Sequence, residues 1–210
     1  MSAVRSRTLP VARLGIIGGG QLARMLVPEA ARLGCETLIL DPTPASPGGE
    51  LATRQIEGGF DDAERLRELV SGCTVTTYEI ETIDSDALRA LEAEGHRIIP
   101  APAVLAVIQD KLLQKERLAA AGVPVPEFRA LDEPDPMAMA AFGVPLVQKA
   151  RRGGYDGRGV AVFTDVIVEE KVLPISSMVE RYVDYRCELA VLVARGGDAE
   201  TRSWPVVEMV

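Results

Sequence analysis

Short apolar runs alternate with amphipathic stretches along residues 12–100, and this alternation restricts the fold more than any other feature. It predicts strands over residues 14–18, 36–41, 73–78 and 97–100, and helices over residues 21–33, 61–70 and 85–94. Strands that alternate with helices are typical of a parallel sheet covered by helices on its faces. The sequence therefore predicts an α/β fold that begins with a Rossmann-like parallel sheet in residues 1–100. Pro28 lies inside the first helix, so we expect a kink or a late helix start there.

The pattern changes after residue 100. Residues 102–108 and 110–121 have helical spacing, and the Val-Pro-Val-Pro run at 123–126 predicts a stiff extended connector. Beyond the connector we expect mainly strands, over residues 144–149, 160–164, 177–183 and 188–194. A domain boundary is therefore expected between residues 100 and 123.

Composition excludes several classes of function. The net charge of −8 argues against holding duplex nucleic acid by the overall field of the protein. Cys35, Cys73 and Cys187 are far apart, which is not typical of a disulfide framework or a zinc site and suits a reducing cytoplasm. His96 is the single histidine, so the sequence offers too few histidines for a histidine metal site and only one for a Ser-His-Asp hydrolase. Since there is neither a signal peptide nor a long apolar run, we expect a cytoplasmic protein without a membrane span.

A glycine-rich turn, GGGQLA at residues 18–23, joins the first predicted strand to the first predicted helix. Such a turn brings backbone N–H groups and a helix N-terminus close to an anion. Its G-x-G-x-x-A spacing fits a dinucleotide fingerprint, and Asp41 at the end of the next strand would then bind a ribose. A tight turn that binds no ligand is the alternative reading.

A second glycine-rich segment, QKARRGGYDGRGV at residues 148–160, carries four glycines between 153 and 159. Lys149, Arg151, Arg152 and Arg158 flank or enter it. A mobile loop with exposed N–H groups and cations is suited to close over a polyphosphate. The alternative is a solvated β-hairpin that turns at Asp156-Gly157.

Two acidic segments are further candidates for binding sites. Residues 178–188 combine an apolar strand with acidic residues, as a nucleoside site does when backbone groups bind adenine and a carboxylate binds ribose. Residues 77–81, TYEIE, follow a strand at its carboxyl end, where parallel sheets bind ligands. Solvated acidic surface is the alternative for both segments.

Taken together, these segments resemble one family. Residues 110–126, DKLLQKERLAAAGVPVP, resemble the beginning of an ATP-grasp fold. Combined with residues 18–25 and with the loop at 149–159, they resemble the N5-carboxyaminoimidazole ribonucleotide synthetases, a family of ATP-grasp ligases. The resemblance extends from about residue 14 to the last residue, and GGYDGRG is its most specific part.

The resemblance implies a four-part organisation and a reaction. The implied parts are a pre-ATP-grasp domain (1–100), connecting helices (101–123), a small β-rich lid of the ATP-grasp fold (124–187) and the beginning of its C-terminal lobe (188–210). The implied reaction carboxylates 5-aminoimidazole ribonucleotide in purine biosynthesis. ATP phosphorylates bicarbonate to carboxyphosphate, which decomposes to carbon dioxide, and the exocyclic amine captures the carbon dioxide as a carbamate. ATP and Mg²⁺ are the implied cofactors, and a homodimer is the implied assembly.

The resemblance also assigns roles to individual residues. The implied ATP-binding residues are Lys111 and Lys149 at the phosphates, Gly153, Gly154, Gly157 and Gly159 in a closing loop, Glu180, Arg181, Tyr182 and Val183 at adenine, and Glu188 at the ribose. The implied catalytic residues, facing bicarbonate and the ribonucleotide, are Tyr155, Asp156 and Arg158. The implied residues at the ribonucleotide are Gly20, Gln21, Leu22 and either Glu79 or Glu81. In this reading the first glycine turn serves the ribonucleotide and not NAD.

The chain departs from the family in one respect. The magnesium carboxylates of such ligases lie in the C-terminal lobe, and no matching acidic pair is present here. We therefore expect a truncated chain with part of an ATP pocket, no competent metal site and magnesium ligands beyond residue 210. Other ATP-grasp ligases such as a formate-dependent transformylase, an NAD-binding Rossmann module and a non-catalytic nucleotide-binding relic stay open as alternatives.

Overall fold

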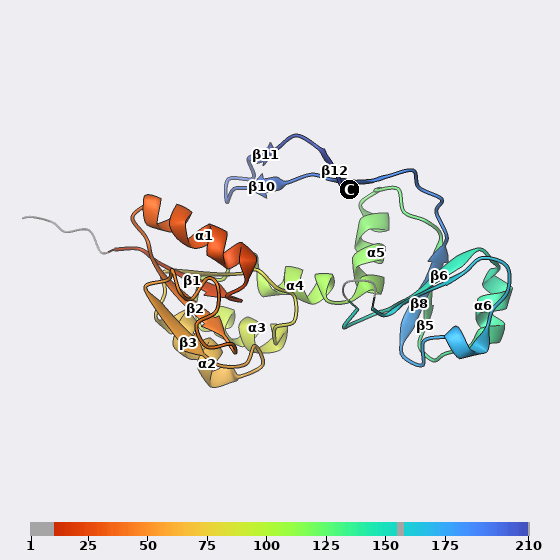
Figure 1. Cartoon of the computed structure of the whole chain (residues 1–210), viewed down its shortest axis with the longest axis horizontal. Coiled ribbons are helices and arrows are strands. Elements are labelled where there is room, and N and C mark those ends of the chain that lie inside the picture. The colour runs from red at the N-terminus through yellow and green to blue at the C-terminus, as the bar shows by residue number, and fades with distance from the viewer. Residues whose placement is uncertain (1–10, 155–157, 210) are drawn as a thin grey trace, which may run out of the picture. The chain divides into compact units, whose positions relative to one another are not determined.

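The computed structural model describes residues 11–154 and 158–209. The chain divides into two compact units, Met1–Val125 with Lys149–Gly159 and Pro126–Gln148 with Val160–Val210 (Figure 1). The glycine-rich loop therefore groups with the first unit, although the chain segments on both sides of it belong to the second. The four-part division expected from the sequence stays a prediction.

A parallel four-stranded sheet is the centre of the first unit. Its order is β3-β2-β1-β4, with β1 at Arg13–Ile17, β2 at Glu36–Asp41, β3 at Arg54–Glu57 and β4 at Val75–Tyr78. β1 and β2 are the central strands, and all their apolar residues except the partly buried Leu14 are buried. The α/β fold with a parallel N-terminal sheet is thereby confirmed.

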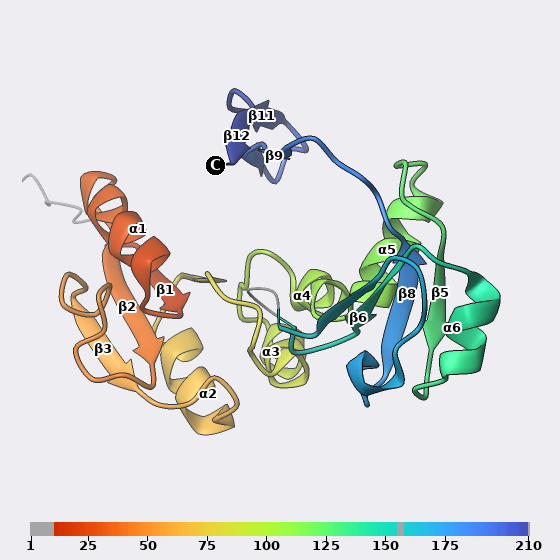
Figure 2. The same ribbon diagram turned by 45° about the vertical axis from the view of Figure 1, so that its right-hand side comes forward.

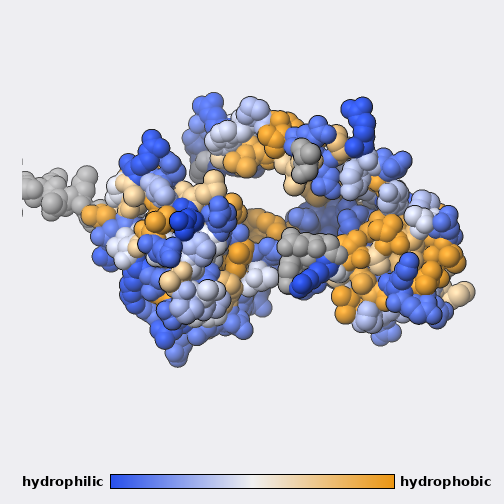
Figure 3. Space-filling view, in the orientation of Figure 1, coloured by the Kyte–Doolittle hydropathy of each residue, from blue (hydrophilic) through white to orange (hydrophobic). Residues whose placement is uncertain are grey.

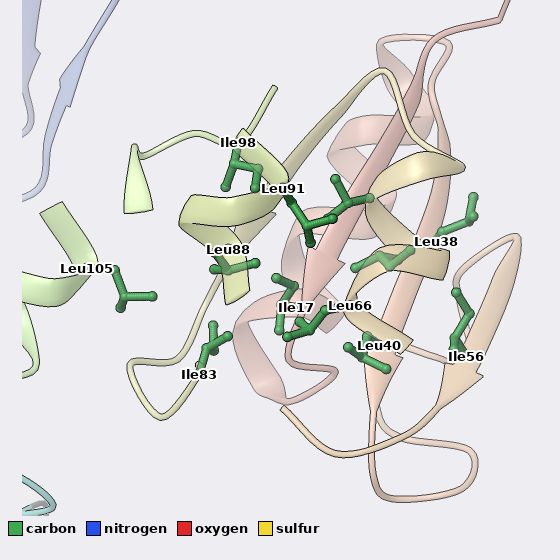
Figure 4. Close-up of a cluster of buried hydrophobic side chains, with 12 residues drawn as sticks. Ile17, Leu38, Leu40, Ile56, Leu66, Ile83, Leu88, Leu91, Ile98 and Leu105 are labelled. Carbon is green, nitrogen blue, oxygen red and sulfur yellow. The ribbon is translucent and has the colours of Figure 1, made fainter. Parts of the chain in front are cut away.

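Helices cover both faces of this sheet. Successive strand residues point to opposite faces, so Ile16 packs with Ala23 and Val27 of α1 (Gln21–Arg32). Ile17 packs on the other face with residues of α2 (Ala63–Ser71) and α3 (Ser85–Ala93), as Figure 4 shows. α4 (Pro102–Ile108) and α5 (Lys111–Ala120) complete the unit.

Aspartates fix where several of these helices begin. Asp62, Asp84 and Asp110 are the N-cap residues of α2, α3 and α5, and each side chain accepts two backbone N–H groups of the first turn. This satisfies donors that have no partner within the helix. The second helix, predicted over 61–70, is confirmed, but it begins at Ala63 after its N-cap Asp62. α1 begins at Gln21 and contains Pro28, so a late start is wrong.

The second unit is built on a sheet in the order β5-β8-β6-β7, and Figure 2 shows β8 beside β5. The strands are β5 (Phe128–Leu131), β6 (Leu146–Ala150), β7 (Val160–Phe163) and β8 (Ser177–Arg181), with α6 (Pro136–Phe142) and the short 3-10 helix η1 (Glu169–Lys171). Met139 and Phe142 of α6 form a core with Leu146, Phe163 and Val179.

A buried glutamine joins β6 to β8 in this sheet. Gln148 is fully buried, and its Nε2 donates to Ser177 Oγ at 2.9 Å and to the Leu173 carbonyl at 3.2 Å. Its Oε1 accepts the Leu173 N–H at 2.9 Å. Every polar atom of this side chain therefore has a partner, as burial of an amide requires.

The last part of the chain forms small antiparallel pairs. β12 (Val207–Met209) pairs with β9 (Glu188–Ala190), and β10 (Val193–Arg195) pairs with β11 (Thr201–Ser203). Leu192 and Trp204 are among several exposed apolar side chains of this segment. Figure 3 shows hydrophobic residues at several places on the molecular surface. The strand predicted over 188–194 is present as two short strands, β9 and β10, because the ladder is interrupted between them.

Other local predictions also differ from the structure. The strand predicted over 97–100 is wrong: residue Ile98 forms only an isolated bridge to Thr76, and Pro100 has no N–H for a ladder. β3, β5 and α6 were not predicted. These elements are short, and few of their residues are buried, so their hydrophobic periodicity is weak.

Candidate functional site

The glycine turn lies between β1 and α1, and two carboxylates accept its N–H groups. Gly19 N–H donates to Asp41 Oδ2 at 2.7 Å. Gly20 N–H donates to Glu79 Oε1 at 2.6 Å, and Ala23 N–H donates to Glu79 Oε2 at 3.2 Å. Negative charge at a helix N-terminus is favourable, so Glu79 serves α1 as a capping group from a distant strand.

The close approach of these side chains explains why the turn is made of glycines. A Cβ at Gly18 would lie 2.7 Å from Glu79 Cγ, and a Cβ at Gly20 would lie 2.8 Å from Glu79 Oε1. A Cβ at Gly19 would lie 2.1 Å from Ser46 Oγ. Real Cβ atoms are essentially never found at such distances from other heavy atoms. A side chain at Gly18 or Gly19 would therefore displace Glu79 or Ser46, whereas at Gly20 only the flexible end of the Glu79 side chain would have to shift.

Asp41 is not placed as a ribose-binding residue. Its side chain is buried, Oδ2 accepts from Gly19 and Oδ1 accepts the Thr43 N–H at 2.8 Å. The following loop closes over the turn, because Gly48 N–H donates to the Gly19 carbonyl at 2.7 Å. The carboxylate therefore stabilises the turn itself, which disfavours the NAD-binding alternative.

The structure separates the two glutamates that sequence reasoning left open. Glu79 faces the glycine turn as described, next to Gly20, whereas Gln21 and Leu22 are exposed at the start of α1. Glu81 is exposed and lines a different hollow, at the carboxyl side of β4. Gln109 holds the backbone of residues 81–83 in place, because its Nε2 donates to the Glu81 carbonyl at 2.6 Å and to the Ile83 carbonyl at 2.7 Å.

The hollow at Glu81 is a pocket of about 430 Å³ within the first unit. Acidic and hydroxyl groups of its lining come from the loop before α3 and from the first turn of α3, and cations and glycines come from α5 and from the glycine-rich loop. Its lining residues are Asp61, Glu81, Thr82, Ile83, Asp84, Ser85, Asp86, Ile108, Gln109, Lys111, Arg152, Gly153 and Gly154.

Three of the implied ATP-binding residues therefore meet a residue implied for the ribonucleotide in one pocket: Lys111, Gly153 and Gly154 with Glu81. Lys111 also holds the loop, because its N–H donates to the Arg151 carbonyl at 2.9 Å and its Nζ donates to the Gly154 carbonyl at 3.2 Å. Cations beside a glycine-rich backbone fit the phosphates of a nucleotide.

The remaining loop residues are only partly described. Lys149 lies in β6, and Ala150 N–H donates to the Gly159 carbonyl at 2.8 Å, which closes the base of the loop. Gly159 has φ +72°, a conformation that favours glycine. Arg158 is exposed. Tyr155, Asp156 and Gly157 lie outside the described residues, so their implied roles stay predictions.

The residues implied for adenine and ribose belong to the second unit. Glu180 is buried at the end of β8. Arg181 is held by its neighbours: Nε lies 3.1 Å from Glu127 Oε2, Nη1 donates to the Gly143 carbonyl at 2.7 Å, and Cζ lies 4.4 Å from the centre of the Phe142 ring. The side chain of Arg181 therefore has a structural function within this unit.

The residues after Arg181 are more exposed. Tyr182 and Val183 are exposed apolar side chains, and the Tyr182 N–H donates to the Pro145 carbonyl at 3.2 Å. Glu188 is exposed in β9 and forms a hydrogen bond with Tyr185 that raises the pKa of the Tyr185 hydroxyl. The Glu188 carboxylate therefore lies close to the Tyr185 hydroxyl.

A buried ion pair beside the pocket was missed by sequence reasoning. Arg151 binds the carboxylate of Asp110, with 2.7 Å between Arg151 Nη2 and Asp110 Oδ2. The helix was predicted to begin at Asp110, which is instead its N-cap, and no local motif signals the partner Arg151, 41 residues further along the chain. Within residues 11–154 and 158–209, no group of three or more histidines, cysteines or acids is arranged to hold a metal ion.

Comparisons with known proteins agree with this geometry. Residues 11–109 match the ribonucleotide synthetase preATP-grasp domain, and residues 116–210 match the ATP-grasp domain. The N5-carboxyaminoimidazole ribonucleotide synthase of Mycobacterium bovis is 38% identical in an alignment 216 residues long. The alignment covers 99% of this chain and 50% of that protein. The chain belongs to the N5-carboxyaminoimidazole ribonucleotide synthetase family. This family is the one that its motifs resembled, and its second matched domain is an ATP-grasp domain.

Solved structures of this family have the same fold. The Thermotoga maritima N5-carboxyaminoimidazole ribonucleotide synthetase is 44% identical, with a TM-score of 0.87 over 95% of this chain and 54% of that chain. The Aspergillus clavatus enzyme, solved with ADP and 5-aminoimidazole ribonucleotide, is 33% identical, with a TM-score of 0.83 over 95% of this chain and 54% of its own. The chain spans about half the length of the curated relatives that it matches. In the part of the chain that the structure describes, no helix has both the length and the apolar character needed to cross a membrane.

Proposed function

We propose that this chain takes part in the ATP-dependent carboxylation of 5-aminoimidazole ribonucleotide by bicarbonate, a reaction of purine biosynthesis. The pocket of about 430 Å³ carries the proposal, because Lys111, Arg152, Gly153 and Gly154 share it with Glu81. The Aspergillus clavatus relative was solved with ADP and this ribonucleotide, which supports both ligands. A cytoplasmic location and a homodimer are parts of the same proposal.

The cations of the pocket suit the first half of the reaction. An oxygen of bicarbonate attacks the γ-phosphorus of ATP, the bond to ADP breaks, and carboxyphosphate forms. Lys111 and Lys149 would bind the phosphates and stabilise the charge on the transferred group. The loop at 153–159 would exclude water, because carboxyphosphate hydrolyses when water reaches it. Arg158, Tyr155 and Asp156 would face the reacting groups.

The first unit would supply the ribonucleotide side. Carboxyphosphate releases phosphate and carbon dioxide, and the exocyclic amine attacks the carbon and loses a proton. Gln21 and Leu22 are exposed beside Gly20 and are available for a ligand, whereas Glu79 holds the turn that presents them. Glu81 would lie closer to the reacting amine because it lines the pocket.

Adenosine recognition is assigned to the second unit. The backbone of residues 180–183 would bind adenine, and Glu188 would bind the ribose hydroxyls. The described residues fit a nucleotide but not a magnesium ion, since they offer no cluster of metal ligands. We therefore assign no step of the reaction to a magnesium ion held by the described residues of this chain.

Phosphate release tests the proposed reaction. The protein that carries this sequence is mixed with ATP, bicarbonate and Mg²⁺, and inorganic phosphate is measured with and without 5-aminoimidazole ribonucleotide. We expect release that depends on the ribonucleotide and on bicarbonate. Release that requires formate instead would identify a transformylase, and the same release with or without the ribonucleotide would refute the proposal.

The lysine in β6 gives a separate test of nucleotide binding. Lys149→Ala removes a charge-assisted contact worth about 1.5–3 kcal/mol, so the Kd for fluorescent mant-ATP should rise by about 10- to 150-fold. Lys171→Ala, in η1, is the matched control and should leave the Kd unchanged. An unchanged Kd in Lys149→Ala would remove this lysine from the site.

A further inference from the structure

Asp110 is a buried carboxylate that the proposed reaction does not use. It is the second of the two residues between α4 and α5, directly before Lys111, and its side chain is only 4% exposed. It is not among the described residues that line the pocket. A buried charge is costly unless it is paired and hydrogen-bonded, so its contacts need an explanation.

The contacts of Asp110 join a helix to the glycine-rich loop. Oδ1 accepts the N–H groups of Leu112 at 3.0 Å and Leu113 at 3.3 Å, which caps α5. The Arg151 guanidinium binds the same carboxylate with two nitrogens, Nε at 3.1 Å from Oδ1 and Nη2 at 2.7 Å from Oδ2. A bidentate pair of this kind fixes orientation as well as distance.

The neighbours of this pair extend the junction into the loop. Lys111 N–H donates to the Arg151 carbonyl at 2.9 Å, and Lys111 Nζ donates to the Gly154 carbonyl at 3.2 Å. Arg152 Nε lies 3.8 Å from Asp110 Oδ2, yet the Arg152 side chain is 59% exposed. Arg151 is therefore held inward while Arg152 and Lys111 reach the pocket.

The electrostatics of the site are consistent with a permanent ion pair. Burial raises the pKa of Asp110, but the hydrogen bond from Arg151 and the N–H groups of Leu113 and Leu112 lower it by more, so the carboxyl stays ionised. Its charge balances Arg151 next to a pocket that already holds two further cations.

We propose that Asp110 is a positioning residue: through Arg151 it anchors the base of the glycine-rich loop to the N-terminus of α5, and it thereby sets Lys111 and Arg152 toward the pocket. The nature of the pocket's ligand, a nucleotide phosphate, rests on the proposed function. The anchoring itself rests on the contacts above.

Limited proteolysis measures the anchoring without any ligand. Trypsin cuts after Arg152 and Arg158 when the loop leaves α5, and the cut peptides identify the sites by mass. Asp110→Asn keeps an oxygen that caps α5 but removes the charge that binds Arg151, so cleavage at these two sites should become about tenfold faster or more. Asp135→Asn is the matched control, because Asp135 caps α6 with the same two-bond geometry, and its loop cleavage should equal that of the wild type.

A second variant keeps the test decisive if Asp110→Asn loses its fold. Arg151→Gln leaves the cap of α5 in place and should also release the loop, whereas Arg151→Lys should rescue part of the protection. Wild-type cleavage of the loop in a folded Asp110→Asn protein, or in Arg151→Gln if the first variant unfolds, would overturn the proposal.

Binding of mant-ATP to the same proteins separates the two proposals. If the anchor positions a phosphate site, the Kd should rise by at least about tenfold in Asp110→Asn and stay unchanged in Asp135→Asn. If the wild type does not bind mant-ATP but the loop of Asp110→Asn is released, the anchoring stands and the proposed nucleotide function fails. If mant-ATP binds Asp110→Asn as tightly as the wild type, positioning of Lys111 and Arg152 by Asp110 is refuted.

Discussion

Glu79→Ala should destabilise the N-terminal end of α1 more than any other single substitution of an acidic residue near the glycine turn. The substitution removes the carboxylate that accepts the Gly20 and Ala23 N–H groups at 2.6 Å and 3.2 Å. Hydrogen bonds to a charged group contribute about 1.5–3 kcal/mol each. Water would replace part of this at Gly20, which is half-buried, but not at Ala23, which is fully buried. The net cost should therefore be about 2–3 kcal/mol.

Hydrogen–deuterium exchange of the α1 amides gives a local measure of this cost. A loss of about 2–3 kcal/mol should accelerate exchange about 30- to 150-fold at pH 7 if local opening is limiting. Glu79→Gln retains one acceptor oxygen and should lie between the wild type and Glu79→Ala. Glu29→Ala is the control, because Glu29 lies on the same helix in an exposed pair with Arg32 and should change exchange by less than about threefold. Exchange in Glu79→Ala no faster than in Glu29→Ala would refute the capping role.

Three further predictions concern stability. Gly19→Ala places a Cβ 2.1 Å from Ser46 Oγ and should cost at least about 1–3 kcal/mol, seen as a lower Tm; an unchanged Tm would contradict the close approach. Leu66→Ala, fully buried between α2 and the sheet, should cost about 2–5 kcal/mol in urea denaturation, against less than about 0.5 kcal/mol for the exposed Leu33→Ala. Burial raises the pKa of the Cys73 thiol from 9.0 to about 11, so the stability that the neutral thiol contributes is present below pH 9 and is lost toward pH 11. Cys73→Ala should remove that part of the alkaline loss, and an identical pH profile in the variant would contradict it.

Local signals accounted for most of the first unit. The periodicity of α1, α2 and α3 and the aspartate before α2 depend on residues close in sequence, so they could be predicted. β3 could not, because it is an edge strand in which only Ile56 is buried. The segment at 97–100 has strand-like residues, but it finds only one bridge to β4.

The candidate site divides in a similar way. The positions of the glycine turn, the glycine-rich loop and Lys111 follow from local motifs. The partners of the carboxylates do not follow from local motifs. Glu79 caps a helix that begins 58 positions earlier in the chain, and Asp41 accepts the N–H group of Gly19, which is far from it in sequence. Tertiary contacts of this kind decide between a ligand-binding and a structural role, and no periodicity encodes them.

The buried amide of Gln148 has a consequence for the lysine that follows it. Its hydrogen bonds to Ser177 and Leu173 are satisfied at a single alignment of β6 with the chain around β8. A slip of one residue would place the charged side chain of Lys149 in the apolar interior and the amide outside. The glutamine thus fixes the register of β6. The apolar residues around it can be exchanged while the ammonium group of Lys149 stays on the same face of the sheet.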